Sequence, residues 1–137
     1  MEPPLRIGAL AAAAGVGVQT LRYYERRGLL KAKGRTTGGY REYATDAVRR
    51  VVFIRRAQAM GFTLDEIHDL LALRVRSARR CEPVKRSAVH ARERVRERLA
   101  ALQRMDTILA RLIQACDARQ VTEECPILAA LEPEGGL

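Results

Sequence analysis

The chain has 137 residues, a hydrophobic fraction of 47% and three cysteines, which allows one small domain or one domain plus a long helix. It has no apolar run long enough to span a bilayer and no basic-then-apolar start, so we expect neither a transmembrane helix nor a signal peptide. The protein is therefore expected to be cytoplasmic, without a membrane partner and with reduced thiols. The net charge of +9 lies almost wholly in residues 1–60, which also hold all four tyrosines. A basic block with interleaved tyrosines indicates a polyanionic partner, most often nucleic acid.

Two short helices are predicted at the start, over residues 7–14 and 19–27. The turn between them contains Gly15 and Gly17, and Gly28 suits the end of the second helix. Two short helices joined by a tight turn form a helix-turn-helix. The second helix would enter the major groove of DNA with polar and basic side chains that read base edges and bind phosphates. The candidates are Gln19, Thr20, Arg22, Tyr23 and Arg26.

A basic β-hairpin is predicted over residues 34–43, after an extended or irregular segment at 29–33. Gly38 and Gly39 would supply the positive φ of its tight turn. A hairpin directly after a helix-turn-helix is a wing. We expect Tyr40, Arg41 and Tyr43 to contact the DNA backbone beside the groove.

Two more helices are predicted behind the wing. Thr45 is the expected N-cap of the first, which runs to about Met60 before Gly61. Thr63 and Glu66 have the spacing of a capping box that opens the second. Residues 74–80 are expected to form a basic hinge. The two histidines, His68 and His90, are expected to lie on the surface.

A single long helix is predicted over residues 83–117, since this stretch shows a sustained heptad pattern without an internal glycine. Such a pattern is typical of a coiled coil. With Ala88 at a heptad a position, every a and d position is apolar or a thiol except Arg98. The a positions are Ala88, Val95, Leu102, Leu109 and Cys116, and the d positions are Val84, Ala91, Arg98, Met105 and Leu112.

The three cysteines, Cys81, Cys116 and Cys125, bracket this helix. Cys81 and Cys116 would lie roughly 50 Å apart along it, so one intact chain cannot bring them to one metal ion. If two copies pair antiparallel, Cys81 of one comes beside Cys116 and Cys125 of the other, which gives two identical three-thiolate sites. Cys116 alone would suit a small buried hydrophobe, but the other two lie outside the apolar run. Three thiolates without histidine favour a soft, thiophilic ion.

Together these elements predict a mainly α protein with a winged helix-turn-helix and an antiparallel coiled coil. We expect a DNA-binding domain at 1–74, a hinge at 75–82, a dimerisation helix at 83–117, and a metal-binding loop with the C-terminal tail at 118–137. The sequence contains no phosphate-binding glycine loop and no catalytic triad, so an enzyme is not expected.

The N-terminal motifs resemble the DNA-binding signature of the MerR family. They are Ile7-Gly8, Ala14-Gly15-Val16, the run from Thr20 to Leu30 that contains Arg22-Tyr23-Tyr24-Glu25, Gly39-Tyr40-Arg41-Glu42-Tyr43, and residues 60–67. The resemblance adds Tyr24 to the candidate DNA contacts. It implies a homodimeric, effector-controlled transcription regulator that binds double-stranded promoter DNA and acts on RNA polymerase there.

The cysteine pattern is similar to that of the mercury-responsive branch of this family, which implies Hg(II) as the effector. Copper-responsive members lack a cysteine at the start of the long helix, where this chain has Cys81. Lead-responsive members share much of the spacing, so Pb(II) is the first alternative, followed by Cd(II) or Zn(II). The acidic loop at 117–124 would supply oxygen ligands that broaden selectivity toward harder ions.

The resemblance also implies a mechanism, in which metal binding leads the dimer to bend and undertwist a promoter whose spacer is too long for polymerase, and so activates a mercury-resistance operon. Two alternatives belong to other classes. One is a thiol-based redox or drug sensor on the same scaffold, and the other is a metal-buffering protein whose DNA affinity is incidental.

Overall fold

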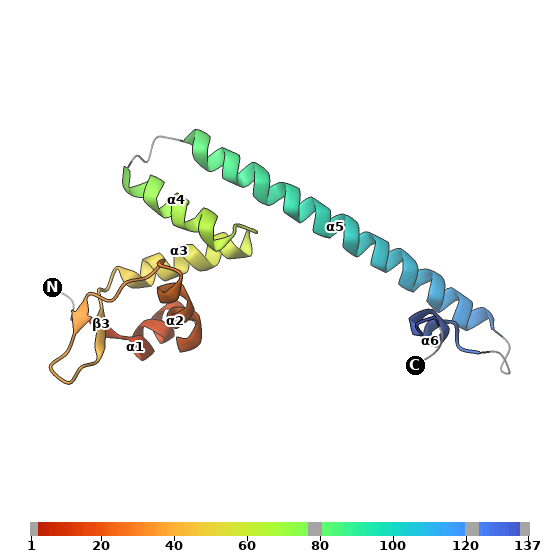
Figure 1. The fold of residues 1–137 in the computed structure, drawn as a ribbon, viewed down its shortest axis with the longest axis horizontal. Coiled ribbons are helices and arrows are strands. Elements are labelled where there is room, and N and C mark those ends of the chain that lie inside the picture. Colours follow the sequence, from red (N-terminus) through yellow and green to blue (C-terminus); the bar gives the residue numbers. More distant parts are fainter. Residues whose placement is uncertain (1–2, 77–80, 120–123, 135–137) are drawn as a thin grey trace. The chain divides into compact units, whose positions relative to one another are not determined.

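The computed structural model describes residues 3–76, 81–119 and 124–134. The chain is mainly helical with one small sheet, as predicted (Figure 1). It divides into two compact units, one that ends at Glu93 and one that begins at Arg94.

The helix-turn-helix is formed by α1 (Ile7–Ala14) and α2 (Val18–Arg26), within one residue of the predicted bounds. Gly15 ends α1 with φ 71° and donates its N–H to the carbonyls of Ala11 and Ala12. This left-handed conformation favours glycine because it has no Cβ. Leu10 and Leu21 are fully buried between the two helices and their neighbours.

The wing is a three-stranded antiparallel sheet of β1 (Leu5–Arg6), β3 (Arg41–Tyr43) and β2 (Gly34–Arg35), in that order. The hairpin of β2 and β3 is as predicted, but only Gly39 has a positive φ, at 83°, so the expectation for Gly38 was wrong. Strand β1 was not predicted. A two-residue strand is too short to show alternation in a sequence.

Helices α3 (Ala47–Ala59) and α4 (Leu64–Arg76) cover the helix-turn-helix. The N-cap of α3 is Asp46 rather than Thr45, and its side chain makes no capping hydrogen bond. The capping box of α4 is confirmed: Thr63 N donates to Glu66 Oε1 at 2.8 Å, and Glu66 N donates to Thr63 Oγ1 at 3.2 Å. Helix α4 continues to Arg76 into the predicted hinge, whose residues 77–80 lie outside the described part of the chain.

One core joins these elements. It is lined by side chains from α1 to α4, the wing and the segment after α2, including Leu10, Leu21, Leu29, Tyr43, Val51, Ile54 and Ile67. Two arginines of α3 fasten the neighbouring backbone to this core. Arg50 Nε donates to the Leu29 carbonyl at 2.6 Å, and Arg55 Nη1 donates to the Gly15 carbonyl at 3.2 Å.

Glu25 connects α2 to the wing. Arg41 Nη1 donates to one oxygen of the Glu25 carboxylate, and the Tyr43 hydroxyl donates to the other. Glu25 is 12% exposed in its side chain, and Tyr43 is fully buried. Burial, and then the bond to Glu25, raises the pKa of the Tyr43 hydroxyl to about 12. This charge-assisted pair of bonds fixes α2 relative to β3.

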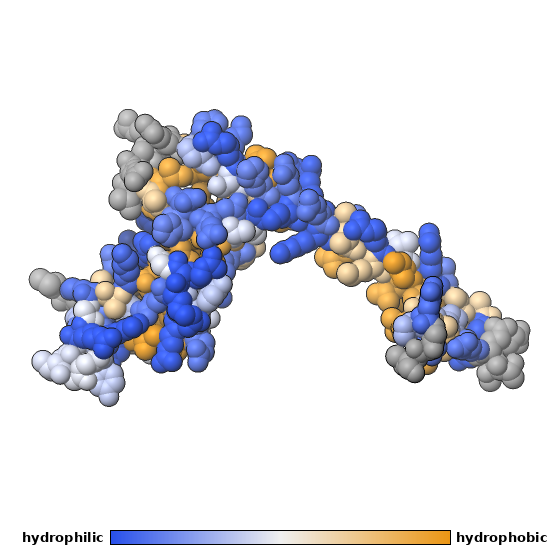
Figure 2. All heavy atoms as spheres, viewed as in Figure 1, coloured by the Kyte–Doolittle hydropathy of each residue, from blue (hydrophilic) through white to orange (hydrophobic). Residues whose placement is uncertain are grey.

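The long helix α5 (Cys81–Ala118) has 38 residues. In the unit that begins at Arg94, none of the described residues is buried. Figure 2 shows apolar side chains gathered along the C-terminal half of α5. Seven large apolar side chains of α5, all in the unit that begins at Arg94, are about half exposed: Val95, Leu99, Leu102, Met105, Ile108, Leu109 and Ile113. We call these seven the α5 stripe.

A short helix that was not predicted, α6 (Pro126–Leu131), follows in the C-terminal tail, with Cys125 at its N-cap. Residues 120–123 of the predicted metal-binding loop lie outside the described part of the chain. Among the described helices, none is long and apolar enough to cross a membrane.

The capping box gives a stability prediction. Thr63→Ala should lower the free energy of unfolding by about 1 kcal/mol, because the N–H of Glu66 loses its acceptor. Thr63→Ser keeps that acceptor and should stay near wild type. Urea unfolding followed by circular dichroism, at one protein concentration, measures both. Equal stability of the alanine and serine variants would show that the capping bond contributes nothing.

The Tyr43 hydroxyl gives a pH prediction. Its pKa is about 12 in the fold against 10.0 for an ordinary tyrosine, so the unfolded chain releases this proton first as the pH rises. The free energy of unfolding should therefore fall between about pH 10 and 12. Tyr43→Phe should fall less steeply, although burial also raises the pKa of Tyr24 and keeps part of the decline. Tyr40→Phe, with an exposed ring, is the control, and a Tyr43→Phe slope equal to wild type would contradict the prediction.

Candidate DNA-binding surface and metal centre

Helix α2 presents most of the predicted DNA contacts to solvent. Gln19, Arg22, Tyr23 and Arg26 are exposed, and Thr20 is half-buried. The Arg26 guanidinium lies 5.7 Å from the centre of the Tyr23 ring. The exposed side of this helix therefore combines cations, an aromatic ring and an amide, which suits a groove lined with phosphates and base edges.

A groove connects this side of α2 to the wing and to the start of α1. Its lining includes one acid, Glu25, and five arginines: Arg6, Arg22, Arg26, Arg35 and Arg41. Tyr40 lies on the groove and is 60% exposed. We call this feature the arginine groove. The sequence reasoning did not name Arg6 or Arg35 as candidates. Arg6 belongs to β1, a two-residue strand that alternation cannot reveal, whereas Arg35 lies in the predicted hairpin.

Two predicted DNA contacts are buried instead. Tyr24 is 2% exposed and Tyr43 is fully buried. The Tyr24 hydroxyl donates to Gln58 Oε1 at 2.6 Å, and burial raises its pKa. The expectation that these two side chains face DNA was therefore wrong. Both instead position α2: Tyr24 contacts α3 through Gln58, and Tyr43 contacts α2 through Glu25.

All three cysteines are free thiols. Cys116, near the end of α5, and Cys125, at the start of α6, are half-buried and lie close enough for their side chains to interact. The pKa of the Cys125 thiol is lowered, chiefly by the backbone N–H groups of Leu128 and Ile127, although neither makes a full capping hydrogen bond. The structure thus brings together two of the three predicted metal ligands and favours loss of a proton from one of them.

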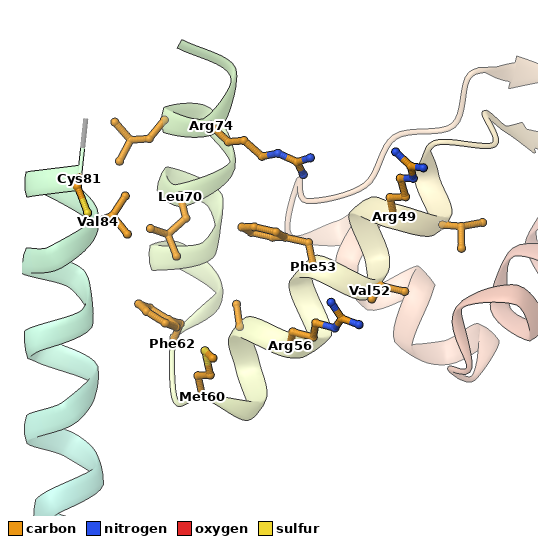
Figure 3. A pocket seen from close by; sticks show the side chains of 13 residues that line it. Arg49, Val52, Phe53, Arg56, Met60, Phe62, Leu70, Arg74, Cys81 and Val84 are labelled. Atoms are coloured by element: carbon orange, nitrogen blue, oxygen red, sulfur yellow. The ribbon is translucent and has the colours of Figure 1, made fainter. Parts of the chain in front are cut away.

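Cys81 belongs to the unit that ends at Glu93 and lies at the first turn of α5, where its side chain is exposed. It borders an apolar pocket between α3, α4 and the start of α5 (Figure 3). Phe53, Phe62, Leu70 and Val84 line the pocket. Among the residues that the structure describes, no three cysteine, histidine or acidic side chains of a single chain come together.

The available ligand chemistry nevertheless fits a soft ion. The three cysteines are free thiols, and His68, on α4, and His90, in the first half of α5, are both exposed. Among the described residues, neither imidazole forms a three-residue ligand cluster with Cys116 and Cys125. Thiolates select soft metals. The pair could supply two thiolate ligands, and a third thiolate would be needed for a trigonal set.

Comparison with known proteins shows the family. The profile of the MerR HTH family regulatory protein matches residues 5–73, and the profile "MerR, DNA binding" matches residues 48–112. The mercuric resistance operon regulatory protein of Shigella flexneri is 44% identical, over 97% of this chain and 91% of its own length.

Two solved structures are similar over nearly the whole chain. The transcription regulator PbrR691 of Ralstonia metallidurans CH34, in complex with lead(II), matches with a TM-score of 0.72 and 39% identity, over 93% of this chain and 98% of that one. The regulator MerR of Bacillus megaterium MB1, in complex with mercury(II), matches with a TM-score of 0.60 and 32% identity, over 90% and 94% of the two chains. This chain therefore belongs to the MerR family of helix-turn-helix transcription regulators, which are DNA-binding proteins rather than enzymes.

Proposed function

We propose that this protein is a homodimeric regulator that binds promoter DNA and activates a mercury-resistance operon when Hg(II) binds to Cys81, Cys116 and Cys125. The observation that carries the proposal is the placement of the thiols. Cys116, in the last turn of α5, interacts with Cys125, at the start of α6, while Cys81 begins the same helix α5. Only a second copy can supply the third thiolate.

The α5 stripe supports the homodimer. Its seven side chains are about half exposed in a single chain. Burial of this apolar surface against a second helix would favour association. Val95, Leu102 and Leu109 occupy heptad a positions, while Leu99 and Ile113 widen the stripe to neighbouring positions. An antiparallel pair of α5 helices would cover the stripe and place Cys81 beside Cys116 of the partner subunit.

Thiolate chemistry and the relatives support the choice of metal. Three thiolates suit Hg(II), whereas structural zinc prefers four ligands. One similar protein is a mercuric resistance regulator, and a similar structure holds mercury(II). Lead(II) is the alternative because another similar structure holds that ion. Cd(II) and Zn(II) rank lower.

The surroundings of Cys81 support coupling between the thiols and the DNA-binding surface. Cys81 and Val84 of α5 share the apolar pocket with Phe53 of α3 and Leu70 of α4 (Figure 3). With the ion bound, Cys81 would be held to Cys116 and Cys125 of the partner subunit. A shift of Cys81 changes the packing against α3 and α4, which cover the helix-turn-helix. The two DNA-binding domains of the dimer would then bend and undertwist the promoter, so that RNA polymerase can engage both promoter elements.

A cross-chain test separates this site from any site within one chain. Mixing Cys81→Ser with a Cys116→Ser, Cys125→Ser double variant gives heterodimers with one complete three-thiolate site and one empty site. Each variant alone has no complete site. Hg(II) binding is measured by thiolate-to-metal absorption in the presence of excess competing thiol. Each variant alone should bind Hg(II) weakly. Tight binding should return when the two variants are mixed, in proportion to the amount of heterodimer that forms.

The control for this test is each variant after unfolding and refolding with itself. Failure of mixing to restore tight binding would refute the cross-chain site. Equal competition by Pb(II) or Cd(II) would change the effector to a broader set of divalent metals. A DNA response that is lost under reductant and insensitive to metal would favour the redox sensor instead.

The recognition helix gives a DNA-binding prediction. Arg22→Ala should weaken binding to a duplex selected by the wild-type protein by about 1–3 kcal/mol. Arg111→Ala removes the same charge from an exposed position on α5 and should bind as wild type does. Fluorescence anisotropy at fixed salt measures both. If both variants bind equally well, α2 is not the recognition helix.

A further inference from the structure

We propose that Arg6, stacked on Tyr40 of the wing, binds a phosphate of the DNA backbone and so extends the DNA-binding surface across the arginine groove. The inference rests on the proposed function, because it assumes that the groove faces duplex DNA. It assigns a DNA-contact role to a residue at the junction of β1 and α1.

The first observation is the position of the Arg6 guanidinium. It lies 4.5 Å from the centre of the Tyr40 ring, within the range of a cation–π contact. The backbone of Arg6 pairs with Glu42 in the sheet, so the side chain starts from a fixed strand. Stacking on a ring restrains a long side chain that would otherwise lose conformational entropy on binding. The guanidinium is therefore held ready for a ligand.

The second observation is the charge around it. Among the described residues, Arg41 is the only one of the five groove arginines with an ion pair, which it makes with Glu25. Glu25 is the only acid that lines the groove, and its two oxygens accept from Arg41 and Tyr43. Arg6, Arg22, Arg26 and Arg35 thus line one groove without an acidic partner. Such a concentration of uncompensated cations suits a phosphate backbone.

The third observation is the continuity of the surface. Arg22 and Arg26 belong to the recognition helix, whereas Tyr40 and Arg41 belong to the wing, and the groove joins both to the start of α1. Arg6 is exposed, so its donors are available to a ligand. A duplex that contacts α2 and the wing must cross this groove, where Arg6 supplies a bidentate phosphate donor.

A backbone contact has a signature that a structural role lacks. Arg6→Met keeps most of the side chain's bulk and removes the charge. It should weaken DNA binding roughly five- to tenfold at low salt, and equally on a selected duplex and a random one. It should also reduce the slope of log affinity against log salt by about 1. Arg6→Lys keeps the charge and should restore most of the slope.

The stacking is tested by a double-mutant cycle. Tyr40→Ala removes the ring, so Arg6→Met should have a smaller effect in that background than in wild type. Tyr40→Phe keeps the ring and should preserve the full effect of Arg6→Met. The full-length dimer is used throughout, and thermal unfolding confirms that each variant is folded. Equal effects of Arg6→Met with and without the ring would overturn the stacking.

The outcomes separate this inference from the proposed function. If wild type binds duplex DNA and Arg22→Ala weakens it, but Arg6→Met changes neither affinity nor salt slope, only the Arg6 assignment fails. A loss confined to the selected duplex would also overturn it, since that pattern indicates base readout. If wild type does not bind duplex DNA at all, both the proposed function and this inference fail.

Discussion

The unbroken span of α5 is the constraint on which the proposed dimer depends. A continuous helix of 38 residues keeps Cys81 away from Cys116, because helical rise is fixed by backbone hydrogen bonds. In the proposed site, the thiol pair formed by Cys116 and Cys125 would therefore take its third thiolate from the partner subunit. The same helix carries an apolar stripe that one chain leaves exposed. In the proposed dimer a single association event would solve both problems, since the surface that drives pairing would also complete the metal site.

Glu25 plays a comparable part in the DNA-binding unit. In the sequence, an acidic residue among many basic ones suggests an exposed side chain that only balances charge. The Glu25 carboxylate is instead largely buried and accepts hydrogen bonds from Arg41 and Tyr43. The recognition helix and the wing are thus joined by charge-assisted bonds, in addition to apolar packing. The ion pair with Glu25 also neutralises part of the positive charge that Arg41 brings to the groove. The other arginines of the groove therefore project from α2 and from the wing, which these bonds hold in a fixed relative position.

The helices were predictable because local rules determine them. Gly15 and Gly28 end helices in left-handed conformations, and Thr63 and Glu66 cap α4 as their spacing indicates. The sequence-based predictions failed where contacts between distant parts of the chain determine the structure. Tyr24 and Tyr43 share their residue type with exposed Tyr23 and Tyr40, and an amphipathic side chain gives no sign of which way it points. Strand β1 exists only through pairing with β3, and Cys125 meets Cys116 only through the return of the chain after α5.

The arginine groove and the cysteines would control different properties of the protein–DNA complex. The groove cations belong to the DNA-binding unit, and their attraction for phosphate is non-specific and does not require the thiols. In the proposed mechanism the protein would therefore remain on DNA whether or not metal is bound. A ligand shifts an equilibrium only through its different affinity for two states. In that mechanism the thiols would act on the relative placement of two DNA-bound domains, and the regulated quantity would be the shape of the promoter rather than its occupancy.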